Sequence, residues 1–427
     1  MKKVAIVIPF DYQLYFSKGE TVEDKTSLIT KYSSFHVQWA KAFRNHKFNT
    51  KIFHISSLDS KVKKRIHESG LEMISSPIAF NFKSHKLSFS IEMIKSIGEF
   101  NPDLIVIMDF SWPQSFLTTL LFGYKNKYII NRNAGSDLAG DLSSDYNAYK
   151  IKNNNLRLEF NLIFIIKYCF YKYKLITLPF KRLFSQLKMR ILFSYSSLVM
   201  ICSKRDLNYI NSYKIINTKV RQLPKPVDID LFKPMDENIC KNKLNWSIEN
   251  NYIIHVSNLY DTKGCEIFIS ILPHLLEKDP AIKFVIIGEG PKKRNIQKLV
   301  KKLNLEENVI FAGRVVHSIL PLYYNASKMI VFLSNRKRGE GRANVLLEAI
   351  SCSLPILSSN LNVLKDLVEP NFGYCVRHND VKTLVKSFEK IYYGSFSFNE
   401  EAALKFRSNY SLKNTVSEIL KTLDYKQ

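Results

Sequence analysis

Residues 329–357 contain a strand-like apolar run, a loop, a helical run and a second strand-like run, in that order. The first run ends at Ser334. The loop then holds Glu340 between two glycines, and the helical run holds Glu348 eight positions later. A strand–loop–helix–strand order predicts a parallel β-α-β unit. The loop carboxylate, the helix N-terminus and the helical carboxylate would then surround one crevice, which can bind a nucleotide diphosphate together with hydroxyl-rich groups.

The same alternation of strand-like and helix-like segments extends along both halves of the chain. Runs of consecutive apolar residues, such as residues 104–108, are typical of strands buried in a parallel sheet. A proline-rich stretch at residues 223–234 indicates a domain junction. We therefore predict an α/β chain with two Rossmann-like, doubly wound parallel-sheet domains that face a cleft. Strands are expected at residues 4–8, 50–55, 104–108, 127–131, 252–256, 282–287, 309–312, 329–333 and 355–357, and helices at residues 33–43, 91–99, 115–122, 265–278 and 292–303.

Length and composition fit two packed domains and exclude several classes of protein. The chain has 427 residues, of which 46% are hydrophobic, but no uncharged apolar run approaches the roughly 20 residues of a membrane span. Six cysteines lie apart without a C-x-x-C pair, which indicates neither a disulfide framework nor a zinc site and suits a reducing cytosol. The apolar run at residues 4–8 is too short for a signal peptide and predicts a buried first strand.

The chain is strongly basic, with 63 Lys and Arg against 38 Asp and Glu and a net charge of +25. Such a charge suits nucleic acid, an anionic membrane surface or phosphate-bearing substrates. No helix-turn-helix, zinc-finger or RNP-like string is present, so we expect no nucleic-acid partner. Asp228 and Asp230 resemble a metal-binding Asp-x-Asp, but they lie in the proline-rich stretch. We therefore expect them to be structural, and we expect no metal site.

Residues 150–190 break the alternation, because they carry ten basic residues and a single acidic one. Apolar side chains recur there at helical spacing, including Phe180, Phe184 and Leu187. Two interpretations stay open. The segment is a basic amphipathic helix that binds an anionic bilayer surface, or it is a core-facing helix whose basic side is solvated.

Three turns that follow predicted strands have residues suited to a phosphorylated ligand. Lys263 and Gly264 precede a helix, where a lysine can reach diphosphate oxygens and the helix N–H groups can assist. Residues 288–291, Gly-Glu-Gly-Pro, permit a tight turn and a close approach of the backbone. Gly313 leaves room for a flat base, whose edge the backbone of the next two residues can contact. Each turn alone also suits a plain strand–helix connection, so the inference depends on their common order and spacing.

Together with Glu340 and Glu348, these turns resemble glycosyltransferase family 4, whose members are retaining enzymes with the two-domain GT-B fold. The resemblance covers residues 251–374 closely and the first half of the chain faintly. Its most specific element is the Glu-x7-Glu pair, followed by a Leu-Pro that ends at residue 355. The proline-rich stretch is also similar to the linker of this family.

The resemblance implies a role for each matching residue. Glu340 would contact hydroxyls of the donor sugar near the reacting carbon, and Glu348 would bind the ribose hydroxyls. Lys263 would neutralise the departing diphosphate without a metal or a cofactor. Asn258 stands where the family has an arginine, so one phosphate-binding cation is absent at that position. The other donor-binding residues lie around the phosphates and the base: Gly313, Arg314, Val315, Gly341, Arg342, Ala343, Asn344 and Val345.

The acceptor side matches the family less closely. The family has a His-Gly-like turn near the reacting centre, and this chain has Ala134 in place of the histidine. Asn133, Ser136 and Asp137 lie in the same stretch and are our candidates to face the acceptor.

The resemblance also predicts the domain organisation. Residues 1–225 would form an N-terminal acceptor-binding domain that includes the basic segment, and residues 226–250 a linker. Residues 251–405 would form the nucleotide-sugar-binding domain. Residues 406–427 would form a C-terminal helix that is able to cross back to the first domain.

These observations predict a retaining, metal-independent glycosyltransferase that moves a sugar from a nucleoside diphosphate sugar to an acceptor hydroxyl. The expected acceptor is a saccharide or a lipid-linked saccharide of surface polysaccharide or lipopolysaccharide synthesis. The protein is expected in the cytoplasm, and at the inner face of the cytoplasmic membrane if the basic segment binds lipid. Two alternatives stay open. A GT-B epimerase would need no acceptor, and Ala134 and Asn258 leave room for a non-catalytic protein that binds nucleotides or glycans.

Overall fold

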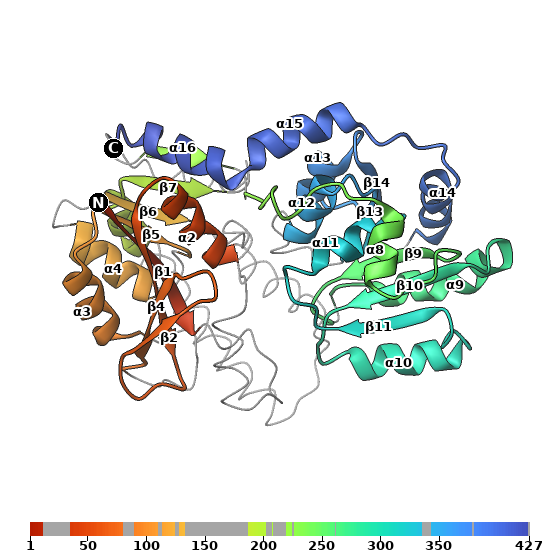
Figure 1. The fold of residues 1–427 in the computed structure, drawn as a ribbon, viewed down its shortest axis with the longest axis horizontal. Coiled ribbons are helices and arrows are strands. Elements are labelled where there is room, and N and C mark those ends of the chain that lie inside the picture. The colour runs from red at the N-terminus through yellow and green to blue at the C-terminus, as the bar shows by residue number, and fades with distance from the viewer. Residues whose placement is uncertain are drawn as a thin grey trace, which may run out of the picture.

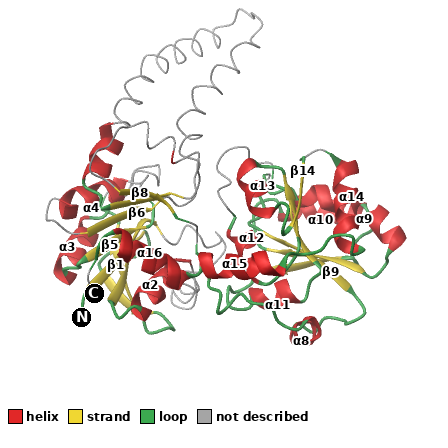
Figure 2. Ribbon diagram, turned by 90° about the horizontal axis from the view of Figure 1, so that it is seen from above, coloured by secondary structure: helices red, strands yellow, loops and turns green. Residues whose placement is uncertain are grey.

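The computed structural model of the protein describes residues 1–11, 35–79, 89–109, 113–123, 128–132, 187–201, 207, 219–223, 226–260, 262–334, 343–377 and 380–425. These residues form two separate sheets, one in each half of the chain (Figure 1). Helices pack against both sheets, and the view from above shows the sheets side by side (Figure 2). The prediction of an α/β fold with two parallel sheets is confirmed.

The N-terminal sheet has the order β3-β4-β2-β1-β5-β6-β7-β8. Its strands are parallel except β3, which pairs with β4 in the antiparallel direction. The strand order reverses between β1 and β5, and ligands of open α/β sheets bind at such a reversal. The described elements of this half are β1 (Lys3–Asp11), α2 (Phe35–Asn45), β2 (Asn49–Ser56), β3 (Lys63–Ile66), β4 (Glu72–Pro77), α3 (Ile91–Phe100), β5 (Leu104–Ile107), α4 (Pro113–Gly123), β6 (Tyr128–Arg132), β7 (Leu198–Ile201) and β8 (Lys219–Gln222).

The period of two along a strand explains the two cores of this half. On β1, Val4 and Ile6 pack with Trp39 of α2 on one face of the sheet. Ala5 and Val7 alternate with them and pack with Met93 of α3 on the other face. A central strand that is buried on both faces needs a continuous apolar run, which is why β1 and β5 were recognisable in the sequence.

Strands β3, β4, β7 and β8 were absent from our prediction. β3 reads Lys-Lys-Arg-Ile and is mostly exposed, so it has no apolar pattern. Its place at the edge of the sheet is fixed by charge instead. The buried Asp59 carboxylate pairs with Arg65 at 2.8 Å and with Lys63 at 3.0 Å. Hydrogen bonds from Arg65, Ser75 and Lys63 outweigh burial and lower the pKa of Asp59.

The C-terminal sheet has the order β11-β10-β9-β12-β13-β14, and all its strands are parallel. Its order reverses between β9 and β12. The elements of this half are α8 (Glu237–Lys243), β9 (Asn251–Val256), α9 (Cys265–Lys278), β10 (Ile282–Ile287), α10 (Lys293–Lys302), β11 (Val309–Gly313), α11 (Leu320–Asn325), β12 (Met329–Phe332), α12 (Asn344–Ser351), β13 (Ile356–Ser359), α13 (Asn362–Val368), β14 (Gly373–Val376) and α14 (Val381–Tyr392). Helix α8 falls in the range 226–250, where we expected a linker.

Two final helices, α15 (Glu400–Tyr410) and α16 (Leu412–Thr422), lead from the second half of the chain back to the first (Figure 1). Phe406 of α15 belongs to the core that includes α12. Val416 and Ile419 of α16 are fully buried in the core formed by β1 and α2. The end of the chain therefore contributes to both cores.

Candidate active site

The loops after β9, β10 and β12 meet where the order of the C-terminal sheet reverses, and glycines let their backbones touch. A Cβ atom on Gly264 would lie 2.0 Å from the carbonyl oxygen of Leu333. A Cβ atom on Gly288 would lie 1.9 Å from the carbonyl oxygen of Ser257. Both glycines also have a positive φ, of 67° and 134° respectively, which other residues rarely adopt. The glycines seen in the sequence therefore fix the shape of this crevice.

Lys263 lies at the predicted place, in the loop after β9. Its ammonium is 5.4 Å from the centre of the Phe332 ring, which belongs to the last residue of β12. The lysine is half-buried and Asn258 in the same loop is exposed. A cation held at the reversal point between β9 and β12 can neutralise an anionic ligand there.

The predicted base pocket lies at the end of β11. Gly313 has a φ of 65° and is half-buried, as is Val315, whereas Arg314 is exposed. The Glu289 carboxylate borders Gly313, because a Cβ atom there would be 3.3 Å from Oε1 of Glu289. This carboxylate pairs with Lys293 at 2.6 Å. The positive φ and the nearby carboxylate therefore favour glycine at position 313. The adjacent ion pair between Glu289 and Lys293 was not part of our prediction.

Helix α12 begins without a side-chain cap. Ala343 occupies the N-cap position with an extended backbone, and its side chain has no oxygen to accept a bond from the first turn. Asn344 is exposed and Val345 half-buried, and the first turn contains no acidic residue. The helix dipole and the absence of a side-chain cap make this end suitable for an anion.

Glu348 lies one turn further along α12 and is buried, with 7% of its surface exposed. Nε2 of His317 lies 3.1 Å from Oε1, and the hydroxyl of Tyr324 donates to Oε2 over 2.9 Å. Burial and the adjacent Glu348 charge raise the pKa of Tyr324 well above its usual range, so this hydroxyl stays a donor. Each oxygen of the carboxylate keeps a further lone pair for a hydroxyl of a ligand.

The partners of Glu348 were not part of our prediction. A buried carboxylate requires donors, but the sequence does not show which donors lie nearby. His317 lies in the connection between β11 and α11, and Tyr324 lies on α11. The ring of Phe232, from the proline-rich stretch, packs edge-on against the His317 imidazole at 4.9 Å between centroids.

His255 is buried inside the C-terminal sheet and takes part in its packing. Its Nδ1 lies 3.0 Å from the carbonyl oxygen of Val331, and its Nε2 lies 2.7 Å from the hydroxyl of Ser257. Burial lowers the pKa of His255 to about 4, so the ring is neutral at neutral pH. It links β9 to β12 directly below the crevice.

The N-terminal sheet contains a buried network of neutral polar groups at β6. Asn131 on β6 is fully buried and donates to Thr119 over 3.0 Å and to Ser196 over 2.8 Å. Nearby in the fold, the amide oxygen of Gln114 accepts a bond from the backbone of Ser90 over 2.8 Å.

Several predicted site residues lie outside the described residues. They are Glu340, Gly341 and Arg342 on the donor side, and Asn133, Ser136 and Asp137 on the acceptor side. Most of the basic segment also lies outside, although Leu187, at its end, is described and is 54% exposed. The described donor-site residues Lys263, Gly313 and Glu348 all lie in the C-terminal half of the chain, in elements of one sheet domain.

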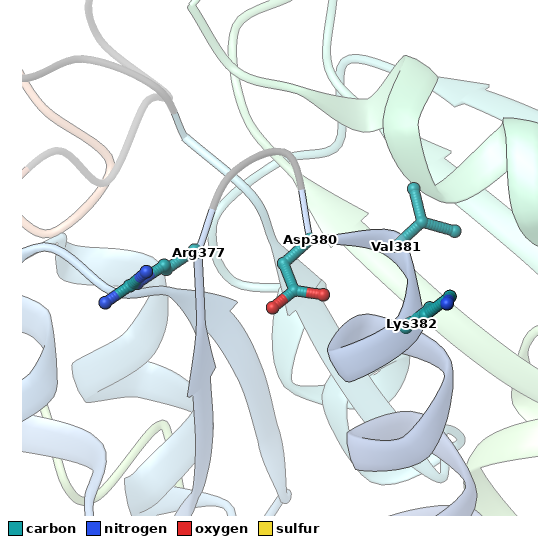
Figure 3. A pocket seen from close by; sticks show the side chains of 4 residues that line it. All are labelled: Arg377, Asp380, Val381 and Lys382. Atoms are coloured by element: carbon teal, nitrogen blue, oxygen red, sulfur yellow. The ribbon is translucent and has the colours of Figure 1, made fainter.

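A surface hollow of about 510 Å³ lies at the connection between β14 and α14. Arg377 extends from the end of β14, whereas Val381 and Lys382 belong to the first turn of α14 (Figure 3). Asp380 caps that helix by accepting a hydrogen bond from the backbone N–H of Thr383 over 3.0 Å. None of the predicted donor-site residues lines this hollow.

Within the ranges that the structure describes, no three His, Cys, Asp or Glu side chains are placed to bind one metal ion. In the same ranges, no helix has the length and apolar character that crossing a bilayer requires.

Comparisons with known proteins agree with this geometry. Residues 236–409 match the family model of glycosyl transferases group 1. The chain is 25% identical over 294 residues to an uncharacterized glycosyltransferase of Methanocaldococcus jannaschii, covering 68% of this chain and 63% of that protein. It is 26% identical over 194 residues to the GDP-mannose-dependent monoacylated alpha-(1-6)-phosphatidylinositol monomannoside mannosyltransferase of Corynebacterium glutamicum, covering 42% of this chain and 50% of that protein. The chain thus spans less than two thirds of the length of either relative.

Among solved structures, the sucrose-phosphate synthase of Thermosynechococcus elongatus superposes with a TM-score of 0.67 at 13% identity. The superposition covers 99% of both chains. It confirms the GT-B fold that the sequence predicted, with two sheet domains in one chain.

Proposed function

From the match of residues 236–409 to the family model of glycosyl transferases group 1, we propose that this chain is a retaining, metal-independent glycosyltransferase. It moves a sugar from a nucleoside diphosphate sugar to an acceptor hydroxyl. One observation carries the proposal. The buried Glu348 carboxylate on α12 is held by two donors, His317 and Tyr324, and the uncapped N-terminus of the same helix can receive phosphate. Ribose hydroxyls and a diphosphate are the ligand groups that this pairing fits.

The chemistry of the step follows from the charges. The acceptor oxygen bonds to the anomeric carbon while the bond from that carbon to the diphosphate breaks, and the acceptor proton passes to the departing phosphate oxygen. Negative charge grows on the diphosphate during this step. Lys263 and the N–H groups at the start of α12 stabilise this negative charge, so the leaving group needs neither a metal nor a cofactor. Glu340 holds hydroxyls of the transferred sugar.

A panel of nucleotides tests the donor site. We expect one of UDP, GDP, ADP or CMP to raise the melting temperature of the full chain, with the same shift in EDTA. A ligand at about 100 times its Kd adds about 2.7 kcal/mol of stability, which such a measurement resolves. A shift that EDTA removes would overturn the metal-independent step. No shift with any nucleotide or its sugars would overturn the donor site.

Replacement of the loop carboxylate tests the reaction itself. Glu340→Gln should abolish transfer from the nucleotide sugar that the panel identifies, whereas the nucleotide should still bind. Glu401→Gln changes an exposed acid on α15 and serves as the matched control, with unchanged transfer. Full activity of Glu340→Gln would refute the assigned role. Turnover of the donor by the unmodified chain without any acceptor would favour an epimerase, and binding without turnover would favour a non-catalytic protein.

We further propose a lipid-linked saccharide as the acceptor and the inner face of the cytoplasmic membrane as the place of reaction. Two observations support this. One relative acts on a phosphatidylinositol mannoside, according to its name. Leu187, which lies near the end of the basic segment, is also exposed. Replacement of Phe180, Phe184 and Leu187 by serine should release the protein from vesicles that contain phosphatidylglycerol. Equal sedimentation of the variant and the unmodified chain with these vesicles would refute the proposal.

A further inference from the structure

A residue of the N-terminal half reaches the candidate ribose site. Gln38 lies on α2 and is buried, with 4% of its surface exposed. Its side-chain nitrogen is 3.3 Å from Nδ1 of His317, in the other half of the chain. The opposite ring nitrogen of His317 contacts Glu348. A continuous line of hydrogen bonds therefore connects α2 of one domain to the carboxylate on α12 of the other.

The chemistry of the three groups fixes the direction of these bonds. An ionised carboxylate accepts only, so Nε2 of His317 must carry the proton that faces Glu348. In the neutral ring, Nδ1 is then an acceptor, and the Gln38 amide donates to it. The glutamine thus holds the imidazole in the tautomer and the orientation that Glu348 requires. This is how outer partners commonly orient a histidine that acts on a further group.

The imidazole has little freedom to turn away. Only 15% of the His317 side chain is exposed, and Phe232 packs edge-on against the ring. Loss of the Gln38 bond should therefore weaken the hydrogen bond from His317 to Glu348. The ring stays in place, but it loses the partner that selects its tautomer.

We propose that Gln38 is a positioning residue of the donor site, so that the ribose pocket is complete only when α2 of the N-terminal domain is docked on the nucleotide-binding domain. This inference rests on the proposed function. It implies that nucleotide binding and the docking of α2 are coupled through His317. Binding of the nucleotide favours the docked arrangement of the two domains, and docking raises the affinity for the nucleotide. The N-terminal domain then contributes to donor affinity as well as to acceptor binding.

The experiment is a double-mutant cycle on nucleotide affinity, measured by titration calorimetry with UDP and with GDP. We expect Gln38→Ala to weaken binding by about fivefold, the size of one hydrogen bond, and to raise the donor KM more than it lowers kcat. His317→Leu should weaken binding further. Adding Gln38→Ala to His317→Leu should then have no effect, because the bond is already lost.

His317→Gln provides a rescue, since its amide can donate to Glu348 and accept from Gln38. We expect this variant to bind within about twofold of the unmodified chain if one amide replaces both ring contacts. Two exposed residues supply matched controls, Gln297→Ala on α10 and His274→Leu on α9, and neither should alter binding.

The possible outcomes separate the two proposals. If the unmodified chain binds neither these nucleotides nor any other of the panel, the proposed function fails and the inference fails with it. If it binds but Gln38→Ala leaves the affinity unchanged, only the inference fails. Additive effects of Gln38→Ala and His317→Leu would also refute it, because they would show that Gln38 acts by packing between the domains.

Discussion

At the ends of its central strands, the C-terminal sheet carries glycines pressed against neighbouring backbone, a lysine and a buried carboxylate. In the N-terminal sheet, Asn131 on β6 belongs to a buried neutral network with Thr119 and Ser196, and the buried Asp109 follows β5. Both sheets are of the same parallel kind, and both reverse their strand order at one point. Architecture alone therefore does not determine what each edge can bind.

The difference also explains where the similarity to other proteins lies. The family match covers residues 236–409 and thus the glycine contacts, Lys263 and Glu348. In the donor site that we propose for that half, a phosphate ligand meets backbone N–H groups at close range, so few residue types fit.

The largest effect should come from the glycines that distinguish the two halves. Gly264→Ala places a Cβ atom 2.0 Å from the backbone of Leu333 at a φ of 67°. It should lower the free energy of unfolding by about 3 kcal/mol through the combined strain and clash. Gly98→Ala on α3 is the matched control, since no atom lies within 4 Å of its Cβ position. It should raise that free energy by about 0.5–1 kcal/mol. Calorimetric melting of both variants measures the contrast, and equal shifts would show that the crevice is not tightly packed.

A smaller change in the free energy of unfolding should come from lowering the pH. The two halves of the chain should lose similar amounts, because each contains a fully buried histidine. Burial lowers the pKa of His54 on β2 and of His255 on β9 to about 4. Each ring is neutral in the folded chain but takes up a proton below about 6.5 when unfolded. Stability is therefore complete above pH 6.5 and falls as the pH drops, by about 2 kcal/mol per histidine at pH 5.

Unfolding with urea between pH 7.5 and pH 5 measures this loss, with one asparagine variant for each half. His54→Asn and His255→Asn keep a donor for the carbonyl oxygen that Nδ1 contacts. Each variant should remove about half of the pH dependence. A pH dependence that neither variant reduces would mean that other groups cause it.

The smallest loss of stability should come from the buried hydrogen bonds of Asn131. Asn131→Ala removes the hydrogen bonds to Thr119 and Ser196 and should cost about 1.5 kcal/mol of stability. It should leave nucleotide affinity unchanged, because Asn131 lies outside the line of hydrogen bonds from Gln38 through His317 to Glu348. Tyr324→Phe is the opposite case, since it removes a bond to Glu348 and should weaken nucleotide binding with little loss of stability. If Asn131→Ala weakened nucleotide binding as much, the division of roles between the sheets would be wrong.

The sequence predicted some parts of the fold and the site well, and others not at all. The bounds of α9 and β10 were predicted to the residue, because long apolar patterns lie between clear turns. β3 was missed because its position depends on ion pairs with Asp59, which no local pattern shows. The same limit applies to the site. A buried Glu348 needs hydrogen-bond partners, but Gln38 and His317 are 279 residues apart in the chain, and only the fold brings them together.

The return of α16 to the first domain has a consequence for biosynthesis. Its side chains complete the core around β1 and α2, so the N-terminal domain lacks part of its interior until the last residues of that helix have left the ribosome. The C-terminal sheet and its helices, which need only α15 from this region, can close earlier. We therefore expect the domain that is synthesised first to be the one that finishes folding last. During that interval it exposes apolar surface that chaperones recognise.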